Sequence, residues 1–306
     1  MRFENKFVGL SVKQILTEEL GFSRRAVTAL KAHEKGIMIN GERVTVRATV
    51  KPGDVLEILS EDEFTRAELS PSEVMPDIIY EDECTVAINK PPYMPTHQSQ
   101  GHFYDTLANS LANYYAKAGR PFVFRSVNRL DRNTSGIVLV AKNRLAASRL
   151  SSAMKEKRIK KTYLAILDGE LDSNSGKIVT YIRRQQESII LREVCEERED
   201  AKLAITHYRV LATKGGKTLV QAYPETGRTH QLRVHFSHMG AQILGDDLYG
   251  EPSELISRHA LHAHSLSFPH PETGEYVELI APLPEDMADI VQKLFGEEIA
   301  YGRAFE

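Results

Sequence analysis

The sequence is poor in the residues that build disulfide frameworks and membrane spans. Its 306 residues include two cysteines, Cys84 and Cys195, which stand far apart and in no paired motif. This excludes a disulfide-rich fold and favours the reducing environment of the cytoplasm. No apolar run approaches the roughly 18 residues of a membrane-spanning helix, and the start "MRFENKFVGL" lacks the apolar core of a signal peptide. We therefore expect a cytoplasmic protein that makes no membrane contact.

A strong net charge is also absent. The formal net charge is −3, which does not mark the whole chain as a nucleic-acid binder. The charge is uneven, however: residues 1–60 hold ten Lys and Arg against seven Asp and Glu, whereas the remainder holds 29 against 35. Such asymmetry indicates a small basic module ahead of a larger acidic domain. With 42% hydrophobic residues, the chain is long enough for two domains with cores of their own.

The first 60 residues read as one compact unit. Ser11 is a suitable cap for an amphipathic helix that ends at Gly21, and Ser23 is a suitable cap for a second helix that ends at Gly36. The following stretch "IMINGERVTV" predicts a β-hairpin, because Asn-Gly between alternating apolar residues is the strongest short hairpin signal.

The rest of the chain has a different pattern. Residues 61–75 are polar and charged, and we interpret them as a linker. Residues 76–306 then alternate irregularly between short strands and helices, with helices expected around 105–117 and 144–156 and paired strands around the Gly215-Gly216 turn. We predict an α+β domain built on a mixed, mainly antiparallel sheet.

The N-terminal unit resembles a known RNA-binding module over residues 9–58. The stretches "GFSRRAVTALKAHEKGIMINGERV" and "VKPGDVLEI" resemble the module named after the small-subunit ribosomal protein S-four. In that family the paired helices carry the RNA-facing surface. The resemblance implies that Arg24 and Arg25, at the start of the second helix, contact phosphate. Taken alone, such an "RR" pair is more often a solvated helix face.

The stretch "VNRLDRNTSG" raises the central question of the sequence, because a single carboxylate, Asp131, stands between two arginines just before an apolar strand. This stretch resembles the "HRLDxxTSG" signature of the RluA-type pseudouridine synthases. Four further blocks of that family occur in the same order, so that the resemblance spans about residues 76–283: "NKPPYMPTHQSQG" (89–101), "KKTYLAIL" (160–167), "ETGRTHQLRVHFSHMGAQILGDDLYG" (225–250) and "LHAHSLSFPHP" (261–271).

The resemblance implies an enzyme that isomerises uridine to pseudouridine in structured RNA. Large-subunit ribosomal RNA is the favoured substrate and transfer RNA the second. The reaction breaks the glycosidic bond, turns the uracil and rejoins it through carbon 5, so that we expect no cofactor and no metal. Nothing in the sequence demands a protein partner.

The resemblance also assigns roles to residues of the catalytic centre. Asp131 is the nucleophile, since a carboxylate can attack and leave again, and Arg233 in "THQLR" is its charged partner. Tyr163 in "KTYLA" stacks on the uracil and is the candidate for moving a proton. Leu261 closes the other side of the base pocket.

Three further residues are expected to contact the substrate. Arg129 enters the gap that the flipped uridine leaves in its helix. Arg228 and His230 lie in the block that contains Arg233, and we place them beside the substrate. The chain departs from the family pattern at Asn128, where a histidine is usual. Because Arg129 and Asp131 are intact, we expect activity to survive this change and its effect to fall on the placement of the flanking nucleotides.

Three other functions compete with this interpretation. His230, His235 and His238 are spaced closely enough for a zinc hydrolase, but no HExxH or paired-cysteine pattern accompanies them. A glycosidase would need a second acidic residue in an equally specific motif. A catalytically silent RNA-binding relative would not need Asp131, Tyr163 and Arg233 together.

Overall fold

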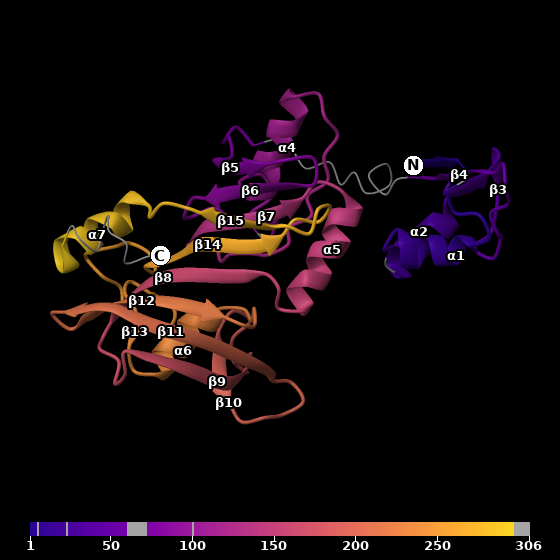
Figure 1. Ribbon diagram of the computed structural model, residues 1–306. Helices are drawn as coiled ribbons and strands as arrows, with labels where there is room; N and C mark the ends of the chain where they lie inside the picture. The colour runs from indigo at the N-terminus through magenta and orange to yellow at the C-terminus, as the bar shows by residue number, and fades with distance from the viewer. Residues whose placement is uncertain (5, 23, 60–71, 100, 297–306) are drawn as a thin grey trace.

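The structure is a computed structural model, and it describes residues 1–296 except 5, 23, 60–71 and 100. The described chain forms two separate β-sheets, one in the N-terminal 59 residues and one in the remainder. The N-terminal unit stands to one side of the larger sheet, next to helix α5 (Arg144–Lys155) (Figure 1).

The N-terminal unit combines short helices with a four-stranded sheet. Its strands follow the order β1-β4-β2-β3. They are β1 (Arg2–Glu4), β2 (Ile37–Ile39), β3 (Glu42–Arg43) and β4 (Val55–Ile58), and the helices are α1 (Val12–Gln14), the π-helix η1 (Ile15–Glu19) and α2 (Arg24–Ala32). A cluster of buried apolar side chains, Leu16 and Leu56 among them, gives this unit a core of its own.

Two local predictions for this unit are confirmed and one needs correction. The Ser11 side chain accepts a hydrogen bond from the N–H of Gln14, so that the predicted cap is present. The hairpin also forms. Asn40 and Gly41 both have positive φ, as a two-residue turn of type I′ requires. The first helix, however, is α-helical only as far as Gln14 and continues as η1, where the N–H of Leu20 bonds to the carbonyl of Ile15. The predicted cap Ser23 lies outside the described residues.

The larger sheet confirms the predicted α+β architecture. Within the described residues it has eleven strands, and one of its pairings, β14 with β7, is parallel. The main path runs β10-β9-β11-β12-β8-β14-β7-β6-β5. The strands are β5 (Ile78–Glu81), β6 (Thr85–Lys90), β7 (Ser135–Ala141), β8 (Lys160–Asp168), β9 (Ser175–Arg184), β10 (Arg192–Cys195), β11 (Lys202–Lys214), β12 (Lys217–Pro224), β13 (Gln242–Ile243), β14 (Leu261–Pro269) and β15 (Tyr276–Ile280).

Helices cover this sheet so that its central strands are buried on both faces. Besides α5 they are α4 (Leu107–Lys117), α6 (Gln231–His238) and α7 (Glu285–Phe295). Val138 of β7 packs into a cluster with residues of α4, α6 and α7, whereas Leu139 packs into a second cluster with α5. Burial on both faces accounts for the uninterrupted apolar run of β7, which an exposed strand would not show.

The N-terminal unit touches the larger one through α5. The guanidinium of Arg144 lies over the ring of Phe22, 4.1 Å from its centroid. The last residues of the predicted linker are ordered, since the hydroxyl of Ser110 in α4 donates to the carbonyl of Val74 at 2.8 Å. Residues 61–71 of that linker lie outside the described part.

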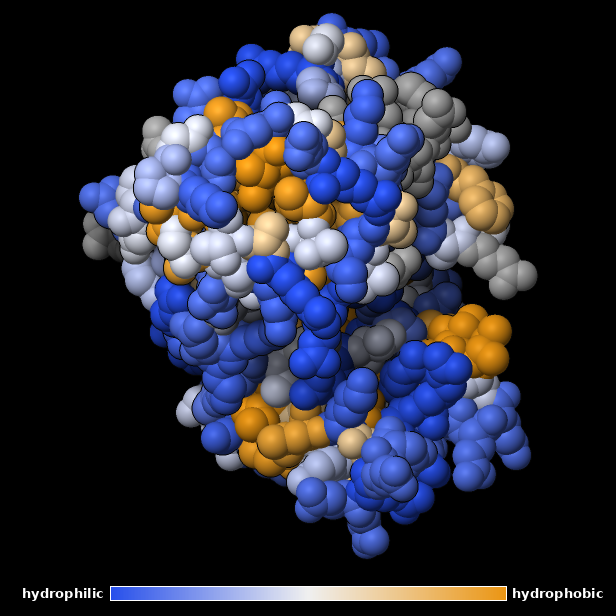
Figure 2. Space-filling view, turned by 90° about the vertical axis from the view of Figure 1, so that its right-hand side faces the viewer, coloured by the Kyte–Doolittle hydropathy of each residue, from blue (hydrophilic) through white to orange (hydrophobic). Residues whose placement is uncertain are grey.

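The side of the molecule that carries the N-terminal unit is largely hydrophilic (Figure 2). None of the described helices is long and apolar enough to span a membrane.

Candidate active site

Asp131 lies in the loop that leads into β7 and borders a cavity of about 640 Å³. Its side chain is 22% exposed, so that the carboxylate is partly enclosed but open to the cavity. The carbonyl of Asp131 accepts the N–H of Thr134, which closes a turn directly before the strand. A carboxylate on such a turn is accessible while the strand behind it is fixed in the core.

Side chains from distant parts of the chain hold this loop. The ammonium group of Lys90 is fully buried and donates to the carbonyls of Arg132 (3.1 Å), Pro91 and Met94 (both 2.8 Å). Burial and the charge of Arg258 lower the pKa of Lys90 to about 7, and the charge of Asp131 opposes this shift.

A second fixed point lies in the Thr134-Ser135-Gly136 triplet. Thr134 and Ser135 share hydrogen bonds with His259 (2.8 Å) and His262 (2.9 Å), which belong to the segment around the start of β14. Gly136 has φ +108°, and a Cβ there would lie 2.2 Å from the carbonyl oxygen of Ala263. Glycine is therefore required where β7 meets β14.

Asn128, which replaces the usual family histidine, is bound to the backbone of β7. Its amide nitrogen donates to the carbonyl of Ile137 at 2.9 Å, and its amide oxygen accepts the N–H of Leu139 at 2.8 Å. Asn128 thus contributes to the position of the loop that carries Asp131.

Arg233 is held mainly by a carboxylate other than the one expected. Its guanidinium makes two hydrogen bonds to Asp246, of 2.7 and 2.6 Å, and the Asp246 side chain is completely buried. Its remaining nitrogen lies 3.7 Å from Asp131. Burial alone would lower the pKa of Arg233, but its hydrogen bonds to Asp246 and the charges of Asp246 and Asp131 raise it. The predicted proximity to Asp131 is present, with Asp246 as the buried anchor.

His230 approaches the same carboxylate from the start of α6. Its Nε2 lies 3.9 Å from Asp131, and its Nδ1 shares a 2.7 Å hydrogen bond with the hydroxyl of Tyr249. Burial lowers the pKa of His230 despite the opposing charge of Asp131. A neutral imidazole is therefore favoured at this place.

Tyr163 and Leu261 line the same cavity as apolar surfaces. They come from the adjacent strands β8 and β14, and are 9% and 4% exposed. Burial, and then the charge of Asp131, raise the pKa of the Tyr163 phenol. Tyr163 therefore stays protonated at neutral pH and has a proton to donate rather than to accept.

The remaining predicted residues lie at the rim or elsewhere. Arg129 is exposed and Arg228 is partly buried; both border the cavity, and Nε of Arg228 donates to the carbonyl of Leu203 at 2.9 Å. Arg24 is exposed at the start of α2 and does not border it. Arg25 is part of α2, but its side chain lies outside the described part of the structure.

Sequence reasoning missed Lys90, Lys161, Asp246, Tyr249 and Arg258 as parts of this site. The first four lie within the family blocks, but nothing in those blocks shows which side chains meet. Arg258 lies between two blocks; its Nη1 donates to the carbonyl of Asn133 at 3.1 Å, and it makes two hydrogen bonds to Asp286. Only the folded chain brings these residues to the Asp131 loop.

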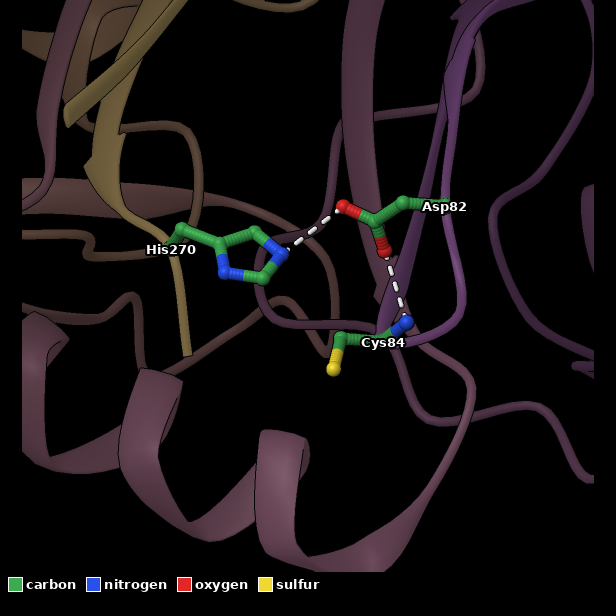
Figure 3. Close-up of side chains that lie close together, drawn as sticks. All are labelled: Asp82, Cys84 and His270. Carbon is green, nitrogen blue, oxygen red and sulfur yellow. Dashed lines mark hydrogen bonds and ion pairs between the residues drawn. The ribbon is translucent and has the colours of Figure 1, made fainter. Parts of the chain in front are cut away.

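One group of described side chains has the composition of a metal site, but its hydrogen bonds argue against that role. Asp82, Cys84 and His270 place possible ligand atoms within 4.8 Å of one another (Figure 3). Nδ1 of His270 accepts the N–H of Thr273 at 3.1 Å, so that Nε2 carries the proton and donates to Asp82 at 3.0 Å. Asp82 also accepts the N–H of Cys84 at 2.6 Å. A metal-binding imidazole nitrogen needs a free lone pair.

The three histidines with zinc-like spacing, His230, His235 and His238, do not converge either. The two ring nitrogens of His235 each pair with a threonine hydroxyl at 3.0 Å, those of Thr206 and Thr180. His238 is exposed at the end of α6, and His230 faces Asp131. The close spacing of the three histidines therefore does not create a metal site: His235 belongs to the core, and His230 and His238 point elsewhere.

Comparison with known proteins decides the family. The sequence model of the RNA pseudouridylate synthase family matches residues 85–238. The chain belongs to this family. The predicted class of enzyme, an isomerase that converts uridine to pseudouridine in RNA, is thereby confirmed.

Individual relatives agree with this assignment. The chain is 41% identical to the uncharacterized RNA pseudouridine synthase YjbO of Bacillus subtilis over 274 residues, which cover 90% of this chain and 96% of YjbO. It is 34% identical to the ribosomal large subunit pseudouridine synthase D of Neisseria meningitidis, over 85% of this chain and 69% of the relative. The solved human RNA pseudouridylate synthase domain containing 1 matches 72% of this chain and 95% of its own, at 29% identity and a TM-score of 0.56.

Proposed function

We propose that this pseudouridine synthase modifies large-subunit ribosomal RNA and uses Asp131 as its nucleophile. The observation that supports the nucleophile is the place of Asp131, which is open to a cavity and lies 3.7 Å from the anchored Arg233. The choice of ribosomal RNA follows the names of relatives such as the synthase D of Neisseria meningitidis. Ribosomal RNA of bacteria is cytoplasmic, so that the proposal also places the enzyme in the cytoplasm.

In this mechanism the target base occupies the space between Tyr163 and Leu261. The carboxylate of Asp131 forms a bond to the sugar or to the base, and the bond between the ribose C1′ and the uracil N1 breaks. The uracil turns, its C5 bonds to C1′, and the proton of C5 is lost while N1 gains one. The bond to Asp131 breaks again, so that the carboxylate is regenerated and no oxidant or reductant is consumed.

The base must leave its helix to reach this cavity. Extruding a nucleotide costs a few kcal/mol, which contacts to the protein have to offset. Arg129 is exposed at the rim, two residues before Asp131, and is suited to fill the space that the base vacates. Arg228 and His230 would contact the nucleotide from the opposite wall.

We further propose a division of labour between residues 1–60 as RNA-binding module, residues 61–75 as linker and residues 76–306 as catalytic domain. The separate core of the N-terminal unit and its exposed Arg24 support this division. Arg24 and Arg25 would hold RNA phosphates and direct the choice of substrate, while the chemistry takes place at Asp131.

Mapping pseudouridines in total RNA from cells with and without the gene tests the proposed substrate. The proposal predicts that one or more sites in large-subunit ribosomal RNA disappear with the gene and return with the wild-type protein. Loss of sites only in transfer RNA would overturn the choice of substrate but leave the chemistry intact. An unchanged map would contradict the proposed function.

A further inference from the structure

One lysine that borders the cavity has no counter-ion within the described chain. Three lysines line this part of the cavity: Lys155, Lys157 and Lys161. Lys157 forms an ion pair with Glu225 at 2.7 Å, and Lys155 is exposed to solvent. Lys161 is half-buried. Among the described residues, no hydrogen-bond acceptor or carboxylate pairs with its ammonium group.

The strand geometry shows where this ammonium group lies. Lys161 is two residues before Tyr163 on β8, so that both side chains extend from the same face of the strand. Its Nζ lies 3.9 Å from the position that a Cβ on Gly227 would take, which places it between β8 and the loop before α6. The neighbouring Lys160 is exposed and does not border the cavity.

The surroundings of Lys161 indicate that its ammonium group is suited to pair with an anionic group of a ligand. Burial lowers its pKa, and no charged neighbour contributes to this shift, in contrast to Lys90, where Asp131 does. The ion pairs of Asp131 in the described structure are those with His230 and Arg233, so that Lys161 is not a partner of this carboxylate. A half-buried cation without a counter-ion costs free energy in the empty enzyme, and an anion that enters the cavity would recover it.

We propose that Lys161 binds a phosphate group adjacent to the target uridine. This inference rests on the proposed function, because it takes the uracil to lie between Tyr163 and Leu261. Two residues along a strand span about 6.6 Å, which is of the same order as the separation of base and phosphate in one nucleotide. An ammonium group is a compact charge with three donors, well suited to phosphate oxygens. Lys161 thus fixes the backbone of the flipped nucleotide while Asp131 meets its reacting atoms.

Small ligands test this role without turnover. Uridine 3′,5′-bisphosphate and uridine carry the same base and sugar but differ in phosphate, and their binding to the full-length protein is measured by NMR titration. We expect the wild type to bind the bisphosphate about tenfold more tightly than uridine, which corresponds to one charge-assisted contact. Lys161→Met should lose this preference, Lys161→Arg should retain most of it, and the control Lys160→Met should keep it. A wild-type preference that survives in Lys161→Met, or no preference in the wild type, would overturn the proposal.

Turnover then separates this inference from the proposed function. On the RNA fragment that contains the mapped target, Lys161→Met should raise KM about tenfold with a smaller change in kcat. Replacing the contacted phosphate by a neutral methylphosphonate should raise the KM of the wild type similarly and add little in Lys161→Met. Equal kinetic constants for Lys161→Met and the wild type would overturn the inference alone. A wild type that forms no pseudouridine would instead refute the proposed function, and the ligand titration would still decide the role of Lys161.

Discussion

The carboxylate of Asp246 holds the guanidinium of Arg233 through two hydrogen bonds of 2.7 and 2.6 Å, in a place that solvent does not reach. This arrangement leaves one nitrogen of Arg233 to face Asp131 at 3.7 Å. Arg233 therefore has a buried structural partner on one side and, on the other, the carboxylate that we propose as the nucleophile.

Asp246→Asn should weaken both the fold and the reaction. Removing one charge leaves Arg233 without its buried partner, and breaking such a pair costs about 3–5 kcal/mol. Denaturant unfolding should show this loss, and kcat/KM should fall because Arg233 no longer has a fixed orientation. Asp247→Asn is the matched control: Asp247 lies 3.8 Å from Arg233 but is 64% exposed, so that its unfolding free energy should change by less than about 1 kcal/mol. Equal effects of the two substitutions would contradict this account.

Gly136→Ala should destabilise the protein more than the same change at Gly215, in a turn that has room for a Cβ. A Cβ at Gly136 meets backbone of Ala263, which cannot move without separating β7 from β14. Gly215→Ala carries a positive-φ penalty of about 1 kcal/mol, because its φ of +59° lies in the left-handed region that other residues can adopt, and a Cβ there meets nothing within 4 Å. Gly136, at φ +108°, lies outside that region, so that its substitution adds backbone strain to the close approach. Thermal unfolding of both variants provides the comparison. A melting temperature of Gly136→Ala at or above that of Gly215→Ala would show that the close approach carries no cost.

Stability should fall as pH decreases from 6.5 toward 4. Burial lowers the pKa of His235 to about 4, whereas the unfolded chain is protonated near its ordinary value of 6.5. Protons thus favour the unfolded chain in this range, and the stability present above pH 6.5 is lost by up to about 1.4 kcal/mol per pH unit from this residue. His235→Gln should make the unfolding free energy less dependent on pH, while His33→Gln, a change at an exposed histidine of the N-terminal unit, should not. An identical pH dependence in wild type and His235→Gln would refute this assignment.

The N-terminal arginines should contribute to the salt dependence of RNA binding. Each phosphate contact adds roughly 0.7–0.9 to the slope of log affinity against log salt. Arg24→Ala combined with Arg25→Ala should lower this slope by between one and two, and should raise KM with little change in kcat. Lys214→Ala, an exposed change in the β11–β12 hairpin, serves as the control. An unchanged slope would mean that this helix does not face the RNA.

Local sequence signals predicted the elements that depend on neighbouring residues. The Asn40-Gly41 hairpin, the helices α4 and α5 and the pair of strands around Gly215 were all foreseeable, since caps, turns and periodicity determine them. The first helix was predicted less well, because nothing local signals the wider turn of η1 after Gln14.

Long-range pairings were not predictable from one sequence. The motif placed Arg233 beside Asp131, yet it did not distinguish Asp246 from Asp247 as the buried partner. Lys90 bonds to the carbonyl of Arg132, 42 residues away, and only the meeting of β6 and β7 brings them together. The sequence thus predicted which residues line the site, whereas the fold shows which side chains hold them.

The turnover of Asp131→Asn is the measurement that tests the account most directly. Asparagine keeps the shape of the side chain but cannot act as a reversible nucleophile, so that pseudouridine formation on the mapped RNA should be undetectable by mass spectrometry. The melting temperature should stay within a few degrees of the wild type, and RNA affinity should change little, because the 22% exposed carboxylate lies 3.7 Å from Arg233, beyond hydrogen-bond distance, whereas Asp246 bonds to Arg233 directly. Pseudouridine formed by purified Asp131→Asn, with wild-type enzyme excluded, would contradict the assignment of Asp131 as the nucleophile.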